Sequence, residues 1–260
     1  MVHVHIEKKL RATLLHLFSL AGLLPQGDVL DAGAKDGLES AYLSHIATNP
    51  ARKVVAVEPL QRNIDLLRAK QKVIPNLEIV QGGLSNATGT ATYLKTGGST
   101  EFNAHARDVA EKAARDGTRA NLISFDLMTV DSLFTTRRLA FAHWDVEGME
   151  LGVLQGAAST LRRDRSFFTV EAYPKSKPDG FHVLMRMVHS LNYHAYEISE
   201  TCGWPWDCRN FLCVPQERVG AFMKLNESVS LAALMKLESS AASVGRRMAG
   251  GVDVQEGRLR

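Results

Sequence analysis

Carboxylates and glycines follow the apolar runs of this 260-residue chain in a regular way. In the segment DAGAKDG, Asp31 ends one such run, and Gly33 and Gly37 follow it. Glycines let a turn between a strand and a helix approach a ligand closely, and the helix presents its positive N-terminal end there. The pattern is typical of a turn over a small ligand, and a purely structural turn is the alternative.

A second acid, Glu58, ends the next apolar run, VVAVE. At the end of the second strand of a parallel sheet, a carboxylate can accept hydrogen bonds from both hydroxyls of an adenosine ribose. A dinucleotide site favours G-x-G-x-x-G, whereas Lys35 and Asp36 occupy the middle of this turn. The added carboxylate suits a positively charged ligand, such as the sulfonium and amino groups of S-adenosylmethionine. A solvated strand end is the alternative for Glu58.

A third group of ionisable residues lies in the segment HWDVEGME. Strand alternation places His143, Asp145 and Glu147 on one side of the chain and Trp144 and Val146 on the other. We expect Asp145 to lie nearest the cleft as a general base, with His143 as its partner or substitute. The structural alternatives are a buried, hydrogen-bonded histidine and acids that favour the start of a helix.

A fourth acid, Glu171, follows the run FFTV and is a further candidate base. Together with Asp145 and Glu147 it could hold a divalent cation, because hard cations prefer oxygen ligands. Three acids at one sheet edge are common without a metal, so no metal site is predicted.

Strand-like and helix-like runs alternate along the chain, which predicts a mostly parallel sheet with helices on both faces. The expected strands are residues 28–34, 53–59, 76–85, 139–149, 167–174, 193–199 and 210–216. The expected helices are residues 38–48, a segment through 63 and 67, 150–161 and 181–191.

The segments outside this alternation are less regular. A hairpin is expected around residues 91–95, followed by a mobile loop on the acceptor side at 97–108. Residues 6–21 have the apolar spacing of an amphipathic packing helix, which we favour over a signal peptide. The predicted division is therefore a packing helix at 1–26, a catalytic domain at 27–218, and a helix with a solvated tail at 219–260.

Composition narrows the function classes. Lys and Arg total 31 against 28 for Asp and Glu, so the charge of +3 gives no sign of a dedicated nucleic-acid binder. No run of about twenty apolar residues is present, so no transmembrane segment is expected. Three cysteines clustered late in the chain favour a reducing compartment, and we predict a cytoplasmic location.

Seven segments in order resemble the FkbM-type S-adenosylmethionine-dependent methyltransferases. They extend over Val29 to Pro215 and read VLDAGAKDG, VVAVEP, EIVQGGLSNATGTATYL, TVDSL, WDVEGMELGVLQGA, FFTVEAYP and NFLCVP. The most specific of them is D-V-E-G-x-E followed by L-x-G-A. Two positions depart from the family: Lys35 replaces a common Asn, and His143 replaces a common Lys.

The resemblance implies a seven-stranded, doubly wound, Rossmann-like sheet with a closing antiparallel strand and an N-terminal helix. It implies S-adenosyl-L-methionine as cofactor and a hydroxyl of a sugar, glycan or secondary metabolite as acceptor. The implied cofactor residues are Asp31, Gly33, Ala34, Asp36, Gly37, Glu58, Pro59, Asn63, Ser85 and Asp145. The candidate catalytic residues are Asp145, His143, Glu147 and Glu171. For Asn63, a role in bracing its own helix is an equal alternative.

Two other functions are compatible with such a sheet. An NAD-dependent oxidoreductase would share the strands and Glu58, but the glycine spacing and the D-V-E-G-x-E segment argue against it. A non-catalytic protein of the same fold would bind cofactor without turnover. The sequence does not identify the acceptor or the oligomeric state.

Overall fold

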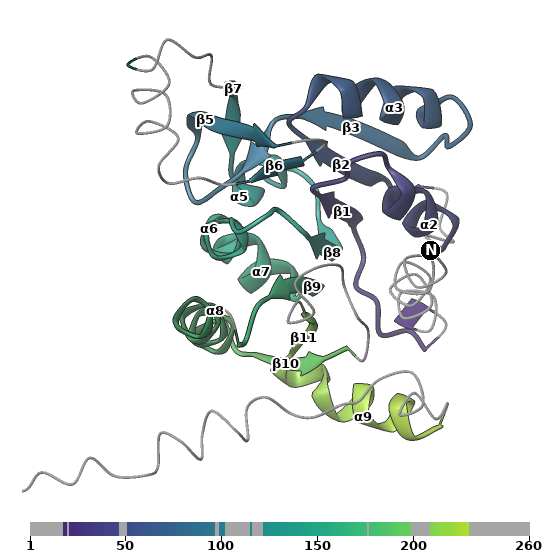
Figure 1. Cartoon of the computed structure of the whole chain (residues 1–260). Coiled ribbons are helices and arrows are strands. Elements are labelled where there is room, and N and C mark those ends of the chain that lie inside the picture. The colour runs from purple at the N-terminus through teal and green to yellow at the C-terminus, as the bar shows by residue number, and fades with distance from the viewer. Residues whose placement is uncertain are drawn as a thin grey trace, which may run out of the picture.

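The computed structural model describes residues 18–19, 21–46, 51–96, 99–101, 115, 122–175, 177–198 and 209–228. Its main sheet has seven strands in the order β10-β11-β9-β8-β1-β2-β3 (Figure 1). These strands are β1 (Asp28–Ala32), β2 (Val54–Glu58), β3 (Leu77–Gln81), β8 (Leu139–Trp144), β9 (Phe167–Ala172), β10 (Tyr193–Glu197) and β11 (Arg209–Pro215). The five strands from β9 to β3 are parallel, and β11 runs antiparallel to both of its neighbours. The predicted sheet is confirmed.

The central strands form because their residues are apolar on both faces. Every residue of β2, β8 and β9 is buried, which is typical of a parallel strand covered by helices on both sides. The covering helices are α2 (Leu38–Ile46), α3 (Gln61–Gln71), α6 (Glu150–Gly156), α7 (Ala158–Asp164), α8 (Pro178–Ser190) and α9 (Val219–Ser228). One core cluster includes Trp144 with residues of α6, α7 and α8, and the other includes Phe167 with residues of α2, α3 and α9.

A second, four-stranded sheet lies beside the end of β3 (Figure 1). Its strands are β4 (Gly83–Leu84), β5 (Gly89–Thr96), β6 (Ser99–Glu101) and β7 (Leu122–Met128), in the order β4-β7-β5-β6. The β5–β6 pair confirms the expected hairpin. The prediction of a loop at 97–108 is wrong for 99–101, which form β6 because they pair with β5; the remaining residues of that loop lie outside the described part. The strand β7 was not predicted.

Three predicted boundaries also change. The strand expected at 139–149 ends at Trp144, because Glu147 and Gly148 both adopt positive φ angles and turn the chain. The strand expected at 76–85 is interrupted at Gly82, which has a φ of 150°. The helix expected at 150–161 is divided at Ala157 into α6 and α7.

The two ends of the chain lie mostly outside the described residues. This applies to residues 1–17 and 20 of the expected N-terminal packing helix and to the expected tail from residue 229 onward, so the predicted division into three parts stays a proposal. Phe18 is described and buried, and its ring stacks on Phe167 with centroids 4.6 Å apart. Within the described ranges, no helix has the length and apolar character needed to cross a membrane.

Candidate functional site

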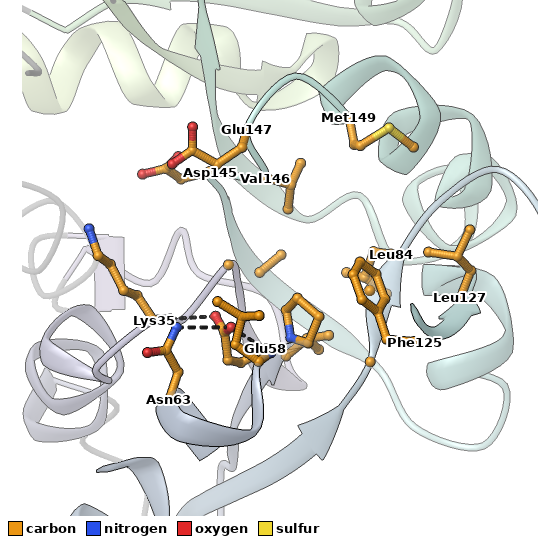
Figure 2. Close-up of a pocket in the computed structure, with 17 residues that line it drawn as sticks. Lys35, Glu58, Asn63, Leu84, Phe125, Leu127, Asp145, Val146, Glu147 and Met149 are labelled. Carbon is orange, nitrogen blue, oxygen red and sulfur yellow. Dashed lines mark hydrogen bonds between the residues drawn. The ribbon is translucent and has the colours of Figure 1, made fainter. Parts of the chain in front are cut away.

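A pocket lies at the carboxyl ends of β1, β2 and β8 and is closed on one side by β4 and β7 of the small sheet (Figure 2). It is open to solvent and is lined mainly by residues of β1, β2, β4 and β7 and of the turns that follow β1, β2 and β8. Cofactor sites of open parallel sheets lie at this edge, outside the carboxyl ends of the strands. The position therefore fits a cofactor site.

The carboxylate of Glu58 is fixed at the end of β2 by three donors. Its Oε1 accepts hydrogen bonds from Leu60 N at 2.9 Å and Asn63 Nδ2 at 3.0 Å, and its Oε2 accepts one from Lys35 N at 2.9 Å. A carboxylate offers about four acceptor positions. The group is thus held rigidly while Oε2 can still accept a hydrogen bond from a ligand.

The turn after β1 is held close to two neighbouring strands. The N–H groups of Gly33 and Ala34 both donate to Val57 O, at 3.0 and 3.1 Å. Gly33 has a φ of 80°, and a Cβ atom there would lie 1.8 Å from Asp145 O. Only glycine fits at this position, because a side chain would both strain the backbone and overlap with the next strand.

The charged side of the pocket is formed by the chain after β8. Figure 2 shows Asp145 and Glu147 at this side of the pocket, and both residues line it. Asp145 N donates to Ala32 O at 3.1 Å, which fixes the start of the turn. The buried Glu150 fixes the rest, because its Oε1 accepts hydrogen bonds from Val146 N at 3.2 Å and Gly148 N at 3.1 Å.

The opposite side of the pocket is apolar. Leu84 of β4 and the β7 residues Phe125 and Leu127 line it (Figure 2). Figure 2 places Glu58 between these side chains and the charged group of Lys35, Asp145 and Glu147. One end of the pocket is therefore suited to a flat apolar group and the other to charged groups.

Two candidate catalytic residues, His143 and Glu171, are buried and lie outside the pocket lining. His143 is buried, and its Nδ1 lies 3.0 Å from Thr169 Oγ1 on β9. In the register of β8 and β9, His143 pairs with Thr169 and Trp144 with Val170, so Glu171 is the next position on β9 beside Asp145.

Glu171 is also buried, and it accepts a hydrogen bond from the Tyr173 hydroxyl at 2.8 Å. Burial, and then the charge of Asp145, raise the pKa of Glu171 to about 8. Its surroundings thus favour the protonated form of this carboxyl group.

Of the predicted site residues, the pocket brings together Gly33, Glu58, Pro59, Asn63, Asp145 and Glu147. The others lie outside its lining: Asp31, Ala34, Asp36, Gly37, Ser85, His143 and Glu171.

The contacts of these outlying residues explain their places. Asp31 is buried and accepts a hydrogen bond from Ser40 of α2, and Asp36 accepts one from Leu38 N at the start of the same helix. Ser85 is buried beside α6, so the preceding residues from Gly82 to Leu84 line the pocket in its place.

Sequence reasoning missed the small sheet's contribution to the pocket. Ile123, Phe125 and Leu127 alternate with polar residues, which is a strand signal, although it does not reveal what the strand faces. Val146 also lines the pocket, against the predicted alternation, because β8 ends before it. In the described residues, no three histidine, cysteine or acidic side chains are placed to hold a metal ion.

Glu150 gives a testable pH dependence of stability. Burial raises the pKa of its carboxyl group to about 7, and the charge of Asp145 adds to this. The folded protein therefore holds this proton more tightly than the unfolded chain, and the free energy of unfolding falls as the pH rises from about 4.5 to 7. Glu150→Gln is expected to remove this part of the loss, on the order of 2–3 kcal/mol.

Urea unfolding of both proteins at several pH values across this interval measures the difference. Glu171 titrates in both proteins, but the charge of Glu150 contributes to its raised pKa, so the difference measures Glu150 together with this coupling. Parallel pH profiles for wild type and variant would show that the Glu150 pKa is ordinary.

The sheet order and the pocket at the ends of β1 and β2 define the class of fold, a Rossmann-like α/β sheet. Residues 31–196 match the model of the methyltransferase FkbM domain, and the chain belongs to this family. The cofactor of this methyltransferase class is S-adenosylmethionine. The resemblance of the sequence motifs is thereby confirmed.

The chain is similar to solved methyltransferase structures to different degrees. The structure of methyltransferase FkbM from Methylobacillus flagellatus KT is 17% identical with a TM-score of 0.52, and it covers 72% of this chain and 43% of that one. The chain thus spans less than half of that protein. An O-methyltransferase from Bacillus cereus in complex with SAH is 11% identical with a TM-score of 0.46, over 78% of this chain and 80% of that one.

Fibrillarin from Aeropyrum pernix, with natively bound S-adenosyl-L-methionine, is 12% identical with a TM-score of 0.44, over 74% of this chain and 67% of that one. At these identities the likeness concerns the fold alone. No curated protein sequence matches the chain.

Proposed function

We propose that this methyltransferase moves a methyl group to a hydroxyl oxygen of a small molecule or glycan. The observation that carries the proposal is the order of groups along the pocket: an apolar end, the fixed Glu58 carboxylate, and a charged end (Figure 2). S-adenosylmethionine has the same order, with an adenine, a ribose and a charged methionine end. The residues present therefore fit the cofactor.

The proposed contacts follow from this order. Phe125 and Leu84 would flank the adenine, because aromatic and aliphatic side chains pack on flat rings. Glu58 would accept hydrogen bonds from the ribose hydroxyls, and Asn63 would keep its carboxylate in place. The turn at Gly33 would lie against the methionine end.

The bound cofactor supplies an electrophilic methyl group on sulfur. The protein's first task is to hold the acceptor oxygen in line with it, and such alignment can contribute about 7–11 kcal/mol to the barrier reduction. The second task is to remove the hydroxyl proton, which typically adds about a hundredfold to ten-thousandfold. We assign this task to Asp145, which lines the charged end of the pocket.

The neighbouring acids and His143 support this assignment. Burial and the charge of Asp145 raise the pKa of Glu171 and favour its protonated form, so we prefer Asp145 as the base. His143 lies behind the pocket surface and is held by Thr169, which suits a positioning role beneath Asp145. Glu147 would orient the acceptor from the same turn. The predicted cytoplasmic location stays a prediction.

Incubation of the protein with methyl-labelled S-adenosylmethionine and fractions of a cell extract tests the proposal. We expect label in a small molecule or glycan, in a linkage stable to mild base, as for a methyl ether. Heat-denatured protein serves as the control for background transfer. Label confined to base-labile esters or to amines would contradict transfer to a hydroxyl oxygen.

A further inference from the structure

Among the described lining residues of the pocket, negatively charged side chains outnumber positively charged ones. Three acids of the described chain line it, Glu58, Asp145 and Glu147, and Lys35 is the one cationic residue among the described lining residues. Figure 2 shows the Lys35 side chain on the same side as Asp145 and Glu147, away from Phe125. A negatively charged group bound at this end would therefore meet two carboxylates and one ammonium group.

The backbone of Lys35 does not require a lysine. Its φ is 52°, a left-handed conformation that costs most side chains about 1–2 kcal/mol and that glycine or asparagine adopts more easily. The structural task of the residue is the bond from its N–H to Glu58, which any residue except proline can make. Strained positions of this kind are often kept for a functional side chain.

The Lys35 ammonium group is available to a ligand. The side chain is exposed, and no described residue accepts a hydrogen bond from its Nζ or forms an ion pair with it. A lysine acts as a compact point charge with three donors, and it reaches an anionic group without the fixed geometry that arginine needs.

We propose that Lys35 binds the α-carboxylate of the methionine part of the cofactor. This inference rests on the proposed function and names the contact at the charged end of the pocket. The methionine part carries one ammonium and one carboxylate group. The acids Asp145 and Glu147 attract the first and repel the second, so Lys35 supplies the charge that lets both groups bind side by side.

Calorimetric titration with two ligands tests this contact. S-adenosylhomocysteine has the amino acid part, whereas 5′-methylthioadenosine has the same adenosine but lacks that part. The variant Lys35→Asn removes the charge and keeps a residue that tolerates the left-handed backbone. We expect it to weaken binding of S-adenosylhomocysteine by about tenfold to a hundredfold, as for a lost hydrogen bond to a charged group, and to leave 5′-methylthioadenosine unchanged.

Two further variants are matched to this test. Lys35→Arg keeps the charge and is expected to retain most of the affinity for S-adenosylhomocysteine. Lys72→Asn makes the same charge change at an exposed position outside the pocket and should affect neither ligand.

Each contrary result has its own meaning. An equal loss of affinity for both ligands would show that the substitution acts by distorting the turn after β1, and it would overturn the proposal. Unchanged binding of both ligands would also overturn it, and a raised KM for the acceptor in that case would assign the ammonium group to the acceptor. If wild type bound neither ligand, the proposed function itself would fail.

Discussion

Replacing Asp145 with asparagine is expected to lower the rate of methyl transfer by at least about a hundredfold. The loss of cofactor affinity should be much smaller, because Glu147 still attracts the ammonium group of the cofactor. The amide has the same shape, and the backbone of residue 145 is fixed by its bond to Ala32 O, so the pocket should keep its form. What is lost is the group that accepts the hydroxyl proton. Single-turnover rates at saturating cofactor measure the effect on the chemical step.

Asp179→Asn is a suitable control, because that residue is an exposed acid in the first turn of α8, outside the pocket. If His143→Ala lost more activity than Asp145→Asn, and the wild-type rate rose with pH through the imidazole range near ~6.5, the general base would be His143. Near-normal turnover in both variants would leave alignment, or Glu171, to account for the rate.

The second large effect is expected in cofactor binding. Glu58→Ala should weaken binding of S-adenosylmethionine by about 1–3 kcal/mol, because charge-assisted hydrogen bonds to the ribose are lost. The change also leaves Leu60 N and Asn63 Nδ2 without their acceptor, so part of the loss comes from a looser turn. Calorimetry gives the affinity, and urea unfolding of the same protein gives the cost to the fold.

Asp65→Ala is the matched control for this variant. It removes one carboxylate from α3, the helix that follows Glu58, but the side chain of Asp65 is 62% exposed and lies outside the pocket lining. Its affinity should equal that of wild type. If Glu58→Ala bound the cofactor equally well, Glu58 would have no place in the site.

The main sheet could be predicted because its strands carry their own signal. Strands buried on both faces are continuous apolar runs, so VVAVE and FFTVEA were recognised as strands without any knowledge of their neighbours. The acids that end these runs, such as Glu58, then fall at one edge of the sheet by topology alone. Gly33 was recognised in the same way, from the turn that must follow β1.

The apolar wall of the pocket depends on contacts far apart in the sequence. Phe125 reaches the site because β7 pairs with β4, and Gly83 lies opposite Leu127 in that register. Local alternation indicates that β7 is a strand but does not identify its partner strand. Which side of the pocket β7 forms follows only from that pairing.

Depth below the surface was the other property that the sequence did not reveal. Alternation grouped His143 with Asp145, but β8 ends at Trp144, so Asp145 lines the pocket while His143 is buried outside its lining. Asp31 is also buried outside the pocket lining, where its carboxylate accepts a hydrogen bond from Ser40 of α2. The helix that buries a strand end cannot be placed from the strand alone.

The central claim, that the pocket at the ends of β1 and β2 holds S-adenosylmethionine, is tested most directly by calorimetric titration of the wild-type protein with S-adenosylhomocysteine. We predict saturable one-to-one binding that S-adenosylmethionine competes for, and no change in the fluorescence of added NADH. Saturable binding of NADH without binding of S-adenosylhomocysteine would contradict the account and support the dinucleotide alternative.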